Sequence, residues 1–445
     1  MTLKVRRILS SFFILLFLII APAIVLYAAG FKLAKNGFSI QKTGMFIIDS
    51  NPRGAKIFIN GEVQRNFFSS LLNKNSFIVT PAKIKNLLPG EYDLTLELNG
   101  YSGWQKKLAI SPGSSTSVEN IYLFKNNLPV QIFPASIESV NLSPDKNRAL
   151  ILSAEELTLF NLADETKKTA GQNGLKGKNI FWSPDGEKVV IDNSLYDLNN
   201  LSSRIDLSKL TANPFNYKWS DNSLYFQDRT SLYRLNNKNL PEKIIGQIQF
   251  NDYLIKGRYL YLIEQAAQAG SLEIIDLPSK KQIKNINLPS SANYYFINPE
   301  QELINLYDNN HKILYLIDPL AAYYSPLVEI INNLKTASWI DDNNLLYAGD
   351  YEIWLYSLET KGKTLITRLS ETINSAVMHP NKNYIIYATS QTINAIELDG
   401  REKRNTAELV KFDSIESFAL NARGDTLYFF GKIGNAEGLY KLSIQ

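Results

Sequence analysis

The amino-acid sequence predicts an all-β protein with a single N-terminal helix, and three observations support this prediction. An apolar run without a charged side chain spans residues 8–30. Over residues 44–125, short strand-like segments alternate with turns rich in Pro, Gly and Asn. From residue 128 onward, a strand–turn–strand unit recurs at intervals of about 36 to 42 residues, the length of one four-stranded propeller blade. The expected order is therefore a transmembrane helix, a small β-sandwich and a β-propeller.

The apolar run Ile8–Gly30 is long enough to cross a membrane. A helix of 23 residues is roughly 34 Å long, slightly more than the ~30 Å hydrocarbon core of a bilayer. Lys4, Arg6 and Arg7 precede the run, so the positive-inside rule places residues 1–7 in the cytoplasm as a short stub. We therefore expect residues 8–30 to be an uncleaved signal anchor that crosses the cytoplasmic membrane once and leaves the rest of the chain outside.

The alternative for this segment is a cleaved signal peptide, with Ala21-Pro22-Ala23 as a loose cleavage site. The apolar run continues past that site to Ala29, whereas the apolar core of a signal peptide has about 7–15 residues. A proline between the two small residues also fits a peptidase poorly. Both interpretations export the body of the chain. A lipoprotein is excluded because the chain has no cysteine to carry the lipid.

The distribution of charge argues against a nucleic-acid partner. The net charge is +4, but the first 43 residues contain six basic side chains and no acidic one. Without those six charges the remainder is close to −2, and it shows no stripe of Lys and Arg. Residues 31–43 form a short polar tether. The lack of cysteine also excludes disulfides, thiol catalysis and Cys-based zinc sites.

Residues 44–125 contain six candidate strands separated by turn motifs. Asn60-Gly61 is a strong hairpin signal, because a type I′ turn needs positive φ at both central residues. The strands are too few and too short to bury two faces unless they form a small sandwich. The six candidates are Gly44–Asp49, Ala55–Ile59, a segment around Ile84, Tyr92–Leu98, Trp104–Ile110 and Thr116–Phe124.

The order of the turn motifs resembles a PEGA domain, a small β-sandwich of bacterial and archaeal surface proteins. The motifs are Pro52-Arg53-Gly54-Ala55, Asn60-Gly61, Thr80-Pro81, Leu88-Pro89-Gly90-Glu91-Tyr92 and Gly100-Tyr101. Arg53 stands where the family name has Glu. The glycines and prolines are explained by the backbone geometry of turns, so the resemblance implies a scaffold without catalytic residues.

An insertion, Glu62–Val79, departs from the short connection that the family has at this place. It contains four large apolar side chains, Phe67, Phe68, Leu71 and Leu72. They are expected to form one amphipathic turn of helix on the sandwich, and the alternative is a patch that binds a partner or touches the membrane.

The repeat predicts the propeller over residues 128–445. The turns of the eight units lie near Pro144, Pro184, Asp221, Gly257, Pro299, Asp341, Pro380 and Ala422. Each unit also carries a third strand, often with the pattern Leu-Tyr-x-Leu, at residues 156–162, 194–198, 231–235, 271–277, 313–318, 352–358, 392–398 and 438–444. Eight blades are favoured, and seven are the alternative because the turn at Gly257 is the weakest.

The two ends of the repeat region predict how the ring closes. Gln445 follows the third strand of the last unit, and Leu128–Phe133 precedes the first unit. We expect Leu128–Phe133 to be the outer strand of the last blade, which leaves no long open edge. The turn Trp182-Ser183-Pro184-Asp185-Gly186 resembles TolB-type and WD-repeat-like propellers, a likeness of architecture that implies no particular function.

No catalytic, cofactor-binding or metal-binding residue is predicted. The chain has two histidines: His379 occupies a repeated turn position, as do Ser183 and Asn298, and His311 lies in a polar turn. Neither has the spacing of a metal site or a catalytic triad. Asp341-Asp342 is expected to be a solvated turn rather than a glycosidase carboxylate pair. No glycine-rich phosphate loop follows a strand and precedes a helix. The chain is therefore predicted not to be an enzyme.

Trp182, Trp219 and Trp339 recur at one position of the repeat. We expect them to pack between blades, and the alternative is an aromatic lining for a sugar or peptide. Together these observations predict a membrane-anchored, extracytoplasmic binding or scaffold protein whose partner is an envelope protein or a cell-wall glycan. The alternatives are an exported propeller enzyme that acts on glycans or peptides, and a structural component of the cell surface.

Overall fold

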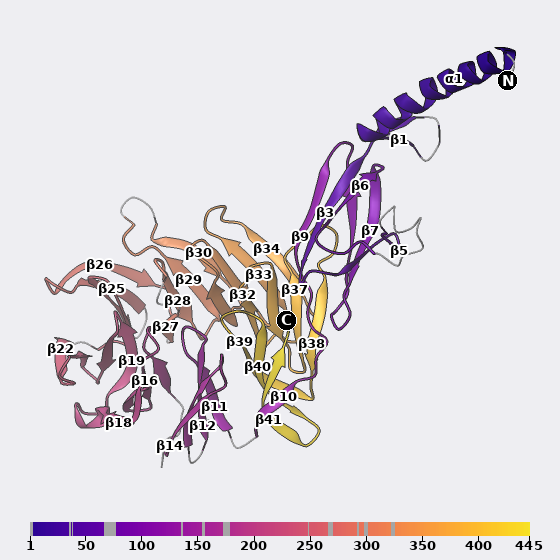
Figure 1. Cartoon of the computed structure of the whole chain (residues 1–445). Coiled ribbons are helices and arrows are strands. Elements are labelled where there is room, and N and C mark those ends of the chain that lie inside the picture. The colour runs from indigo at the N-terminus through magenta and orange to yellow at the C-terminus, as the bar shows by residue number, and fades with distance from the viewer. Residues whose placement is uncertain are drawn as a thin grey trace. The chain divides into compact units, whose positions relative to one another are not determined.

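Figure 1 shows the computed structural model of the chain. The described residues are 3–34, 37, 39–65, 77–134, 137–153, 156–171, 179–247, 249–265, 270–291, 293–297, 301–321 and 325–445. The chain forms two compact units. The first consists of Met1–Asn127, Ile396–Leu409 and Ile444–Gln445, and the second of Leu128–Ala395 and Val410–Ser443.

The first unit begins with helix α1 (Leu3–Ala28), as the apolar run predicts. The part Val5–Ala28 meets the length and hydropathy that a membrane-crossing helix needs, and none of its most apolar stretch is buried by the protein. Pro22 lies inside the helix. The expected tether is more ordered than predicted, because β1 (Phe31–Leu33) and β2 (Ile40–Lys42) pair as an antiparallel hairpin.

A two-sheet sandwich follows the hairpin, and all six predicted strands are present. One sheet has the order β6 (Ala82–Leu87), β3 (Gly44–Asn51), β9 (Ser115–Tyr122), and the other β5 (Glu62–Val63), β4 (Lys56–Ile59), β7 (Gly90–Glu97), β8 (Trp104–Ile110). The sequence did not indicate the short β5. Alternate residues of β3 are buried, as expected for a strand with one face on a core. That core includes Phe46, Ile57, Leu94 and Leu96.

The predicted hairpin turn of the sandwich is confirmed. Asn60 and Gly61 have φ of 51° and 80°, the positive values that a type I′ turn needs at both central residues. The four apolar side chains predicted for the insertion, Phe67, Phe68, Leu71 and Leu72, lie outside the described residues.

From residue 130 onward, the described strands form eight four-stranded antiparallel sheets, as many as the favoured number of blades. Four sheets consist of β11 (Ile137–Leu142), β12 (Arg148–Ser153), β13 (Glu156–Asn161), β14 (Lys167–Gly171); β15 (Ile180–Trp182), β16 (Lys188–Ile191), β17 (Ser194–Asp197), β18 (Asn200–Asp206); β19 (Phe215–Ser220), β20 (Ser223–Gln227), β21 (Ser231–Leu235), β22 (Pro241–Gly246); and β23 (Asp252–Lys256), β24 (Tyr259–Gln265), β25 (Gly270–Asp276), β26 (Lys281–Leu288). The other four consist of β27 (Tyr294–Ile297), β28 (Ile304–Asp308), β29 (Ile313–Ile317), β30 (Leu327–Ile331); β31 (Thr336–Trp339), β32 (Asn344–Ala348), β33 (Glu352–Ser357), β34 (Lys363–Arg368); β35 (Ser375–Met378), β36 (Tyr384–Ala388), β37 (Thr392–Glu397), β38 (Thr406–Lys411); and β39 (Ser414–Leu420), β40 (Thr426–Ile433), β41 (Ala436–Ser443), β10 (Val130–Pro134). A short 3₁₀ helix, η1 (Leu207–Lys209), follows β18.

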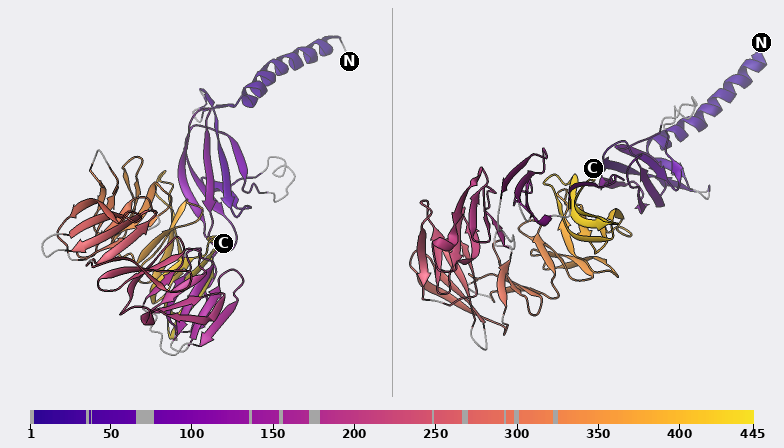
Figure 2. Two further views of the ribbon diagram at one scale, coloured as in Figure 1. Left: turned by 90° about the vertical axis from the view of Figure 1, so that its left-hand side faces the viewer. Right: turned by 90° about the horizontal axis from the view of Figure 1, so that it is seen from below.

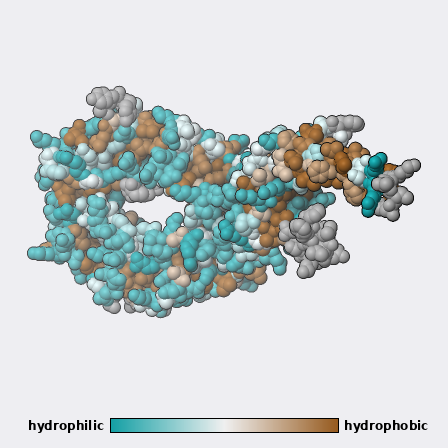
Figure 3. Space-filling model, turned by 45° about the horizontal axis from the view of Figure 1, so that its top comes forward, coloured by the Kyte–Doolittle hydropathy of each residue, from teal (hydrophilic) through white to brown (hydrophobic). Residues whose placement is uncertain are grey.

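The predicted closure of the ring is confirmed. Strand β10 pairs antiparallel with β41, so a strand from before the first repeat completes the last sheet. The right-hand view of Figure 2 shows the sheets of the second unit arranged around a common centre. In the space-filling view of Figure 3 an opening remains within this unit. The second unit is therefore a β-propeller.

The composition of the two units differs from the predicted spans at two places. The whole of 128–445 was expected to form the propeller, whereas Ile396–Leu409 and Ile444–Gln445 belong to the unit of the sandwich. The segment Ile396–Leu409 comprises the end of β37, the loop that follows it and the first part of β38, and it contacts β8 through a buried charged cluster described below.

Candidate functional site

A cavity of about 1000 Å³ lies on the first strands of neighbouring sheets of the propeller. Strands β15, β19 and β23 and the turns that follow them supply most of its wall. Its lining is rich in aromatic side chains, namely Phe181, Trp182, Tyr217, Trp219, Tyr225, Tyr253 and Phe296. Cavities of this size with many aromatic and a few polar groups are typical of binding sites.

The repeated tryptophans pack between sheets, and two of them also line this cavity. The Trp219 Nε1–H donates to the Phe181 carbonyl oxygen of the preceding sheet at 3.1 Å. Trp339 makes the equivalent link, from Nε1 to Asn305 Oδ1 at 3.1 Å. Packing between blades is therefore confirmed for both residues. Trp182 packs against a core formed by β12, β13, β16 and β17, and Trp182 and Trp219 both contribute to the cavity wall.

A second cavity of about 630 Å³ lies at the start of β19, β23 and β27. The larger cavity contacts the end of β19 near its turn, whereas the smaller one contacts Phe215 and Asn216 at the start of β19. Lys218 and Phe296 line both cavities. The two cavities therefore adjoin at the Lys218 side chain.

Lys218 and Asp252 form a buried ion pair between β19 and β23. Lys218 Nζ lies 2.5 Å from Asp252 Oδ1 and donates to the Tyr253 carbonyl oxygen at 2.7 Å. The ammonium also lies 5.3 Å and 5.4 Å from the ring centroids of Tyr253 and Phe296, within cation–π range. Burial lowers the pKa of the Lys218 ammonium, and the Asp252 carboxylate opposes this effect.

Asp252 is held by donors on both of its oxygens. Oδ1 accepts hydrogen bonds from Asn216 Nδ2 and the Tyr253 N–H, both at 2.9 Å, in addition to Lys218. Oδ2 accepts the Phe296 N–H at 2.8 Å. Through these hydrogen bonds the carboxylate links three neighbouring strands, β19, β23 and β27.

Sequence reasoning singled out neither Lys218 nor Asp252. Lys218 is the one charged residue of β19, whereas β23 begins with Asp252 and ends with Lys256. Nothing local shows that Lys218 pairs with Asp252 across 34 residues. The available signal was the strand Phe215–Ser220, in which a lysine stands among three aromatic residues. A lysine in such a strand requires a counter-charge if its ammonium is buried.

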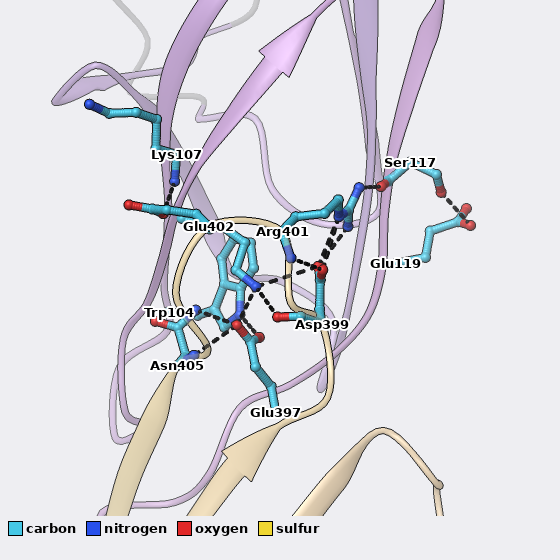
Figure 4. Close-up of polar contacts among 10 residues, drawn as sticks. Trp104, Lys107, Ser117, Glu119, Glu397, Asp399, Arg401, Glu402 and Asn405 are labelled. Carbon is cyan, nitrogen blue, oxygen red and sulfur yellow. Dashed lines mark hydrogen bonds and ion pairs between the residues drawn. The ribbon is translucent and has the colours of Figure 1, made fainter. Parts of the chain in front are cut away.

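A second charged cluster lies in the first unit, around Lys106 of β8 (Figure 4). The Lys106 side chain is fully buried and its ammonium contacts the Glu397 carboxylate, the Asp399 carboxylate at 3.5 Å and the Asp399 carbonyl oxygen at 2.8 Å. Glu397 also accepts hydrogen bonds from Trp104 Nε1 and from the Asn405 N–H, both at 2.8 Å. Each buried charge thus has a partner of opposite sign.

The rim of this cluster adds further contacts between the segment Ile396–Leu409 and the sandwich. Arg401 binds Asp399 through two guanidinium nitrogens and donates to the Ser117 carbonyl oxygen at 2.9 Å. Burial raises the pKa of Asp399, but hydrogen bonds from Arg401 and the charge of Lys106 outweigh it and lower the pKa to about 2. Glu402 accepts the Lys107 N–H at 2.7 Å. These contacts explain why the segment belongs to the sandwich unit.

The two histidines have different surroundings. His379 is buried, and its backbone N–H donates to the carbonyl oxygen five residues later, as do those of Ser143, Ser183 and Asn421 in other sheets, which confirms a repeated turn position. Burial lowers the pKa of His379, although hydrogen bonds with Gly424 and Asn381 oppose the shift. His311 lies exposed in the turn after β28, with Nδ1 2.6 Å from Asp308 Oδ2.

The predicted acidic turn is also present. Asp341 Oδ1 accepts hydrogen bonds from the N–H groups of Asn343 and Asn344, at 3.0 Å and 2.9 Å, as in a solvated turn. Burial raises the pKa of the Asp341 carboxyl group, but these hydrogen bonds outweigh burial, so the pKa is lowered on balance. Over the part of the chain that the structure describes, no three His, Asp or Glu side chains gather in a way that would hold a metal ion.

Comparisons with known proteins bear on the fold alone. The chain matches no family model and no curated protein sequence. Among solved structures, it is similar to a eukaryotic initiation factor with a TM-score of 0.50 and 11% identity, over 72% of this chain and 95% of that one. It is also similar to the Dos1 propeller (TM-score 0.49, 13% identity, 71% and 95% covered) and to the dihydro-heme d1 dehydrogenase NirN (TM-score 0.47, 16% identity, 62% and 67% covered).

Proposed function

We propose that this chain is a membrane-anchored scaffold whose propeller binds a protein or glycan partner on the inner strands β15, β19 and β23. The observation that carries the proposal is the cavity of about 1000 Å³ with its seven aromatic side chains. Aromatic groups supply much contact area for little loss of side-chain entropy, which is why they are enriched at binding surfaces. The role is non-catalytic, since the buried carboxylates Asp252 and Glu397 both lie in ion pairs with lysines.

The location belongs to the same proposal. In it, α1 crosses the cytoplasmic membrane once with residues 1–7 inside, and the sandwich and the propeller lie outside the cytoplasm. Arg6 and Arg7, which lie in the first turns of α1 just before its uncharged stretch, support this orientation. The sandwich, which has PEGA-like turn motifs, acts as a spacer between the membrane helix and the propeller of an envelope protein. The alternatives, an exported enzyme and a purely structural surface component, have no specific observation in their favour.

The orientation can be tested with cysteine labelling, because the chain has no cysteine of its own. Glu371 is exposed on the propeller, so Glu371→Cys offers a single thiol. Intact cells that express this variant should react with a membrane-impermeant maleimide. Labelling only after the cells are lysed would place the propeller in the cytoplasm and contradict the proposal.

The binding role can be tested by capture from envelope extract with the full chain in lipid nanodiscs. Ser220 lines the larger cavity at the end of β19, and Ser220→Arg would fill it without removing an aromatic wall. Ser357→Arg, at the end of β33 and outside this cavity, is the matched control. The wild type and the control should retain the same partner, and Ser220→Arg should lose it. If all three proteins retain the same material, or none retains any, binding at this cavity is refuted.

A further inference from the structure

We infer that the smaller cavity, at the start of β19, β23 and β27, binds a neutral sugar unit. The inference deepens the proposed function, on which it rests, by naming a ligand class for the inner strands. The cavity has a volume of about 630 Å³, which suits a small ring-shaped ligand rather than a long stretch of polypeptide. Three features of its wall carry the inference: two exposed aromatic rings, a set of amide side chains and a formal charge that sums to zero.

The aromatic rings belong to Phe215 and Tyr295. They are 44% and 37% exposed, and both line this cavity. Phe215 starts β19 and Tyr295 lies in β27, so they come from the strands on either side of β23. The face of an aromatic ring is electron-rich and apolar, and it complements the C–H face of a sugar ring.

Amide groups surround these rings, from Asn216, Gln227, Asn251 and Asn293. Gln227 is the most informative, because it is 2% exposed and therefore desolvated. Its Oε1 accepts a hydrogen bond from Asn216 Nδ2 at 2.9 Å, so the two amide groups lie together in the wall. An amide both donates and accepts hydrogen bonds, which suits it to contact the hydroxyl groups of a ligand.

Lys218 provides a further donor. It uses two of its three N–H groups, for Asp252 and for the Tyr253 carbonyl oxygen. Because Lys218 is paired with Asp252 and the other lining side chains are uncharged, the wall carries no net formal charge. The Lys218 ammonium would repel a cationic ligand, and an anionic ligand would compete with Asp252 for that ammonium. A hydroxyl group both donates and accepts hydrogen bonds, so it can bind the amides and the remaining N–H of Lys218. Because it is neutral, it neither repels the ammonium nor competes with Asp252.

The test uses the full chain in lipid nanodiscs and two neutral oligosaccharides as probes, chitotetraose and cellotetraose. Saturation-transfer NMR reports contact with the probe, and calorimetry gives the Kd. Phe215→Ala and Tyr295→Ala remove exposed rings, so they leave the core intact. Tyr351→Ala is the matched control, because Tyr351 is a half-exposed ring on another part of the propeller. Thermal melting checks that each variant is folded.

We expect at least one probe to bind, and each of the two cavity variants to raise its Kd about tenfold or more. Tyr351→Ala should change the Kd less than about twofold. The inference is overturned if neither probe binds at millimolar concentration, if the cavity variants bind as the wild type does, or if the control loses binding instead. If the probes fail while Ser220→Arg still abolishes capture from envelope extract, the sugar site is refuted and the proposed function stands. If both experiments fail, both proposals fail.

Discussion

The buried charged cluster around Lys106 is expected to stabilise the first unit, and this can be tested by removing the lysine charge. The change is Lys106→Met, which keeps an unbranched side chain one heavy atom shorter than that of lysine and removes the charge. Glu397, whose side chain is 5% exposed, would then be a buried carboxylate without a cation. Removing one partner of a buried ion pair typically costs about 3–5 kcal/mol, because the remaining charge stays desolvated.

We expect the free-energy cost of Lys106→Met to lie at the lower end of that range. Glu397 would keep its hydrogen bonds from Trp104 Nε1 and Asn405, and Asp399 would keep Arg401. We therefore expect a loss of about 3 kcal/mol, a factor of more than 100 in the opening equilibrium. Adding Glu397→Gln to the variant should cost less than the sum of the two single changes, since the partners are coupled.

Hydrogen exchange is the suitable assay, because it reports each part of a two-unit chain separately. Backbone amides of β8 and of residues 398–405 should exchange about 100-fold faster in Lys106→Met, whereas those of β15 to β26 should be unchanged. The matched control is Lys363→Met, which breaks a partly exposed pair with Glu329 and should cost about 1 kcal/mol or less. Equal protection of residues 398–405 in the wild type and in Lys106→Met would refute the reasoning.

Three further predictions concern the propeller. Burial lowers the pKa of His379 in the folded chain, so the unfolded chain takes up a proton first, and the stability that His379 contributes falls as the pH drops below about 6.5. Between pH 7.5 and 5.5, the free energy of unfolding of His379→Asn should fall by up to about 1.4 kcal/mol less than that of the wild type, as measured by denaturant titration. The same fall in both proteins would count against this prediction. A Cβ on Gly438 would lie 2.2 Å from a β10 carbonyl oxygen, so Gly438→Ala should lower the melting temperature by several degrees more than Gly434→Ala, whose Cβ meets nothing within 4 Å; equal shifts would argue against the closure. Asp252→Ala should destabilise the propeller by about 3–5 kcal/mol in the same titrations, because it leaves a buried ammonium unpaired, and a loss under about 1 kcal/mol would show that the pair is dispensable.

Much of the fold could be predicted because its signals are local. The third strand of each unit shows its pattern within a few residues, as in Ser231–Leu235, and each turn shows Pro, Gly, Asp or Asn at a regular interval. The closing strand β10 was predictable because one strand was missing at one end and one was left over at the other. The positive φ of Asn60 follows from the residue type at a hairpin turn.

The contacts that organise the candidate site could not be predicted in the same way. The hydrogen bond from Lys106 to Asp399 joins residues 293 positions apart, and nothing in either local sequence identifies the other. The alternation of β8 does place Lys106 on the same buried face as Trp104 and Leu108, which was the one available sign that its charge needs a partner. The cavities depend on side chains from three or four sheets, so they become visible only when the ring is assembled.

In the proposed function, a partner binds the inner strands of a propeller outside the cytoplasmic membrane. The most direct measurement is photo-crosslinking in living cells, with a photoreactive amino acid in place of Ser220 at the larger cavity and, separately, in place of Ser357. A covalent adduct of defined mass is expected from position 220 and none from position 357. Equal adducts from both positions, or none from position 220, would contradict it.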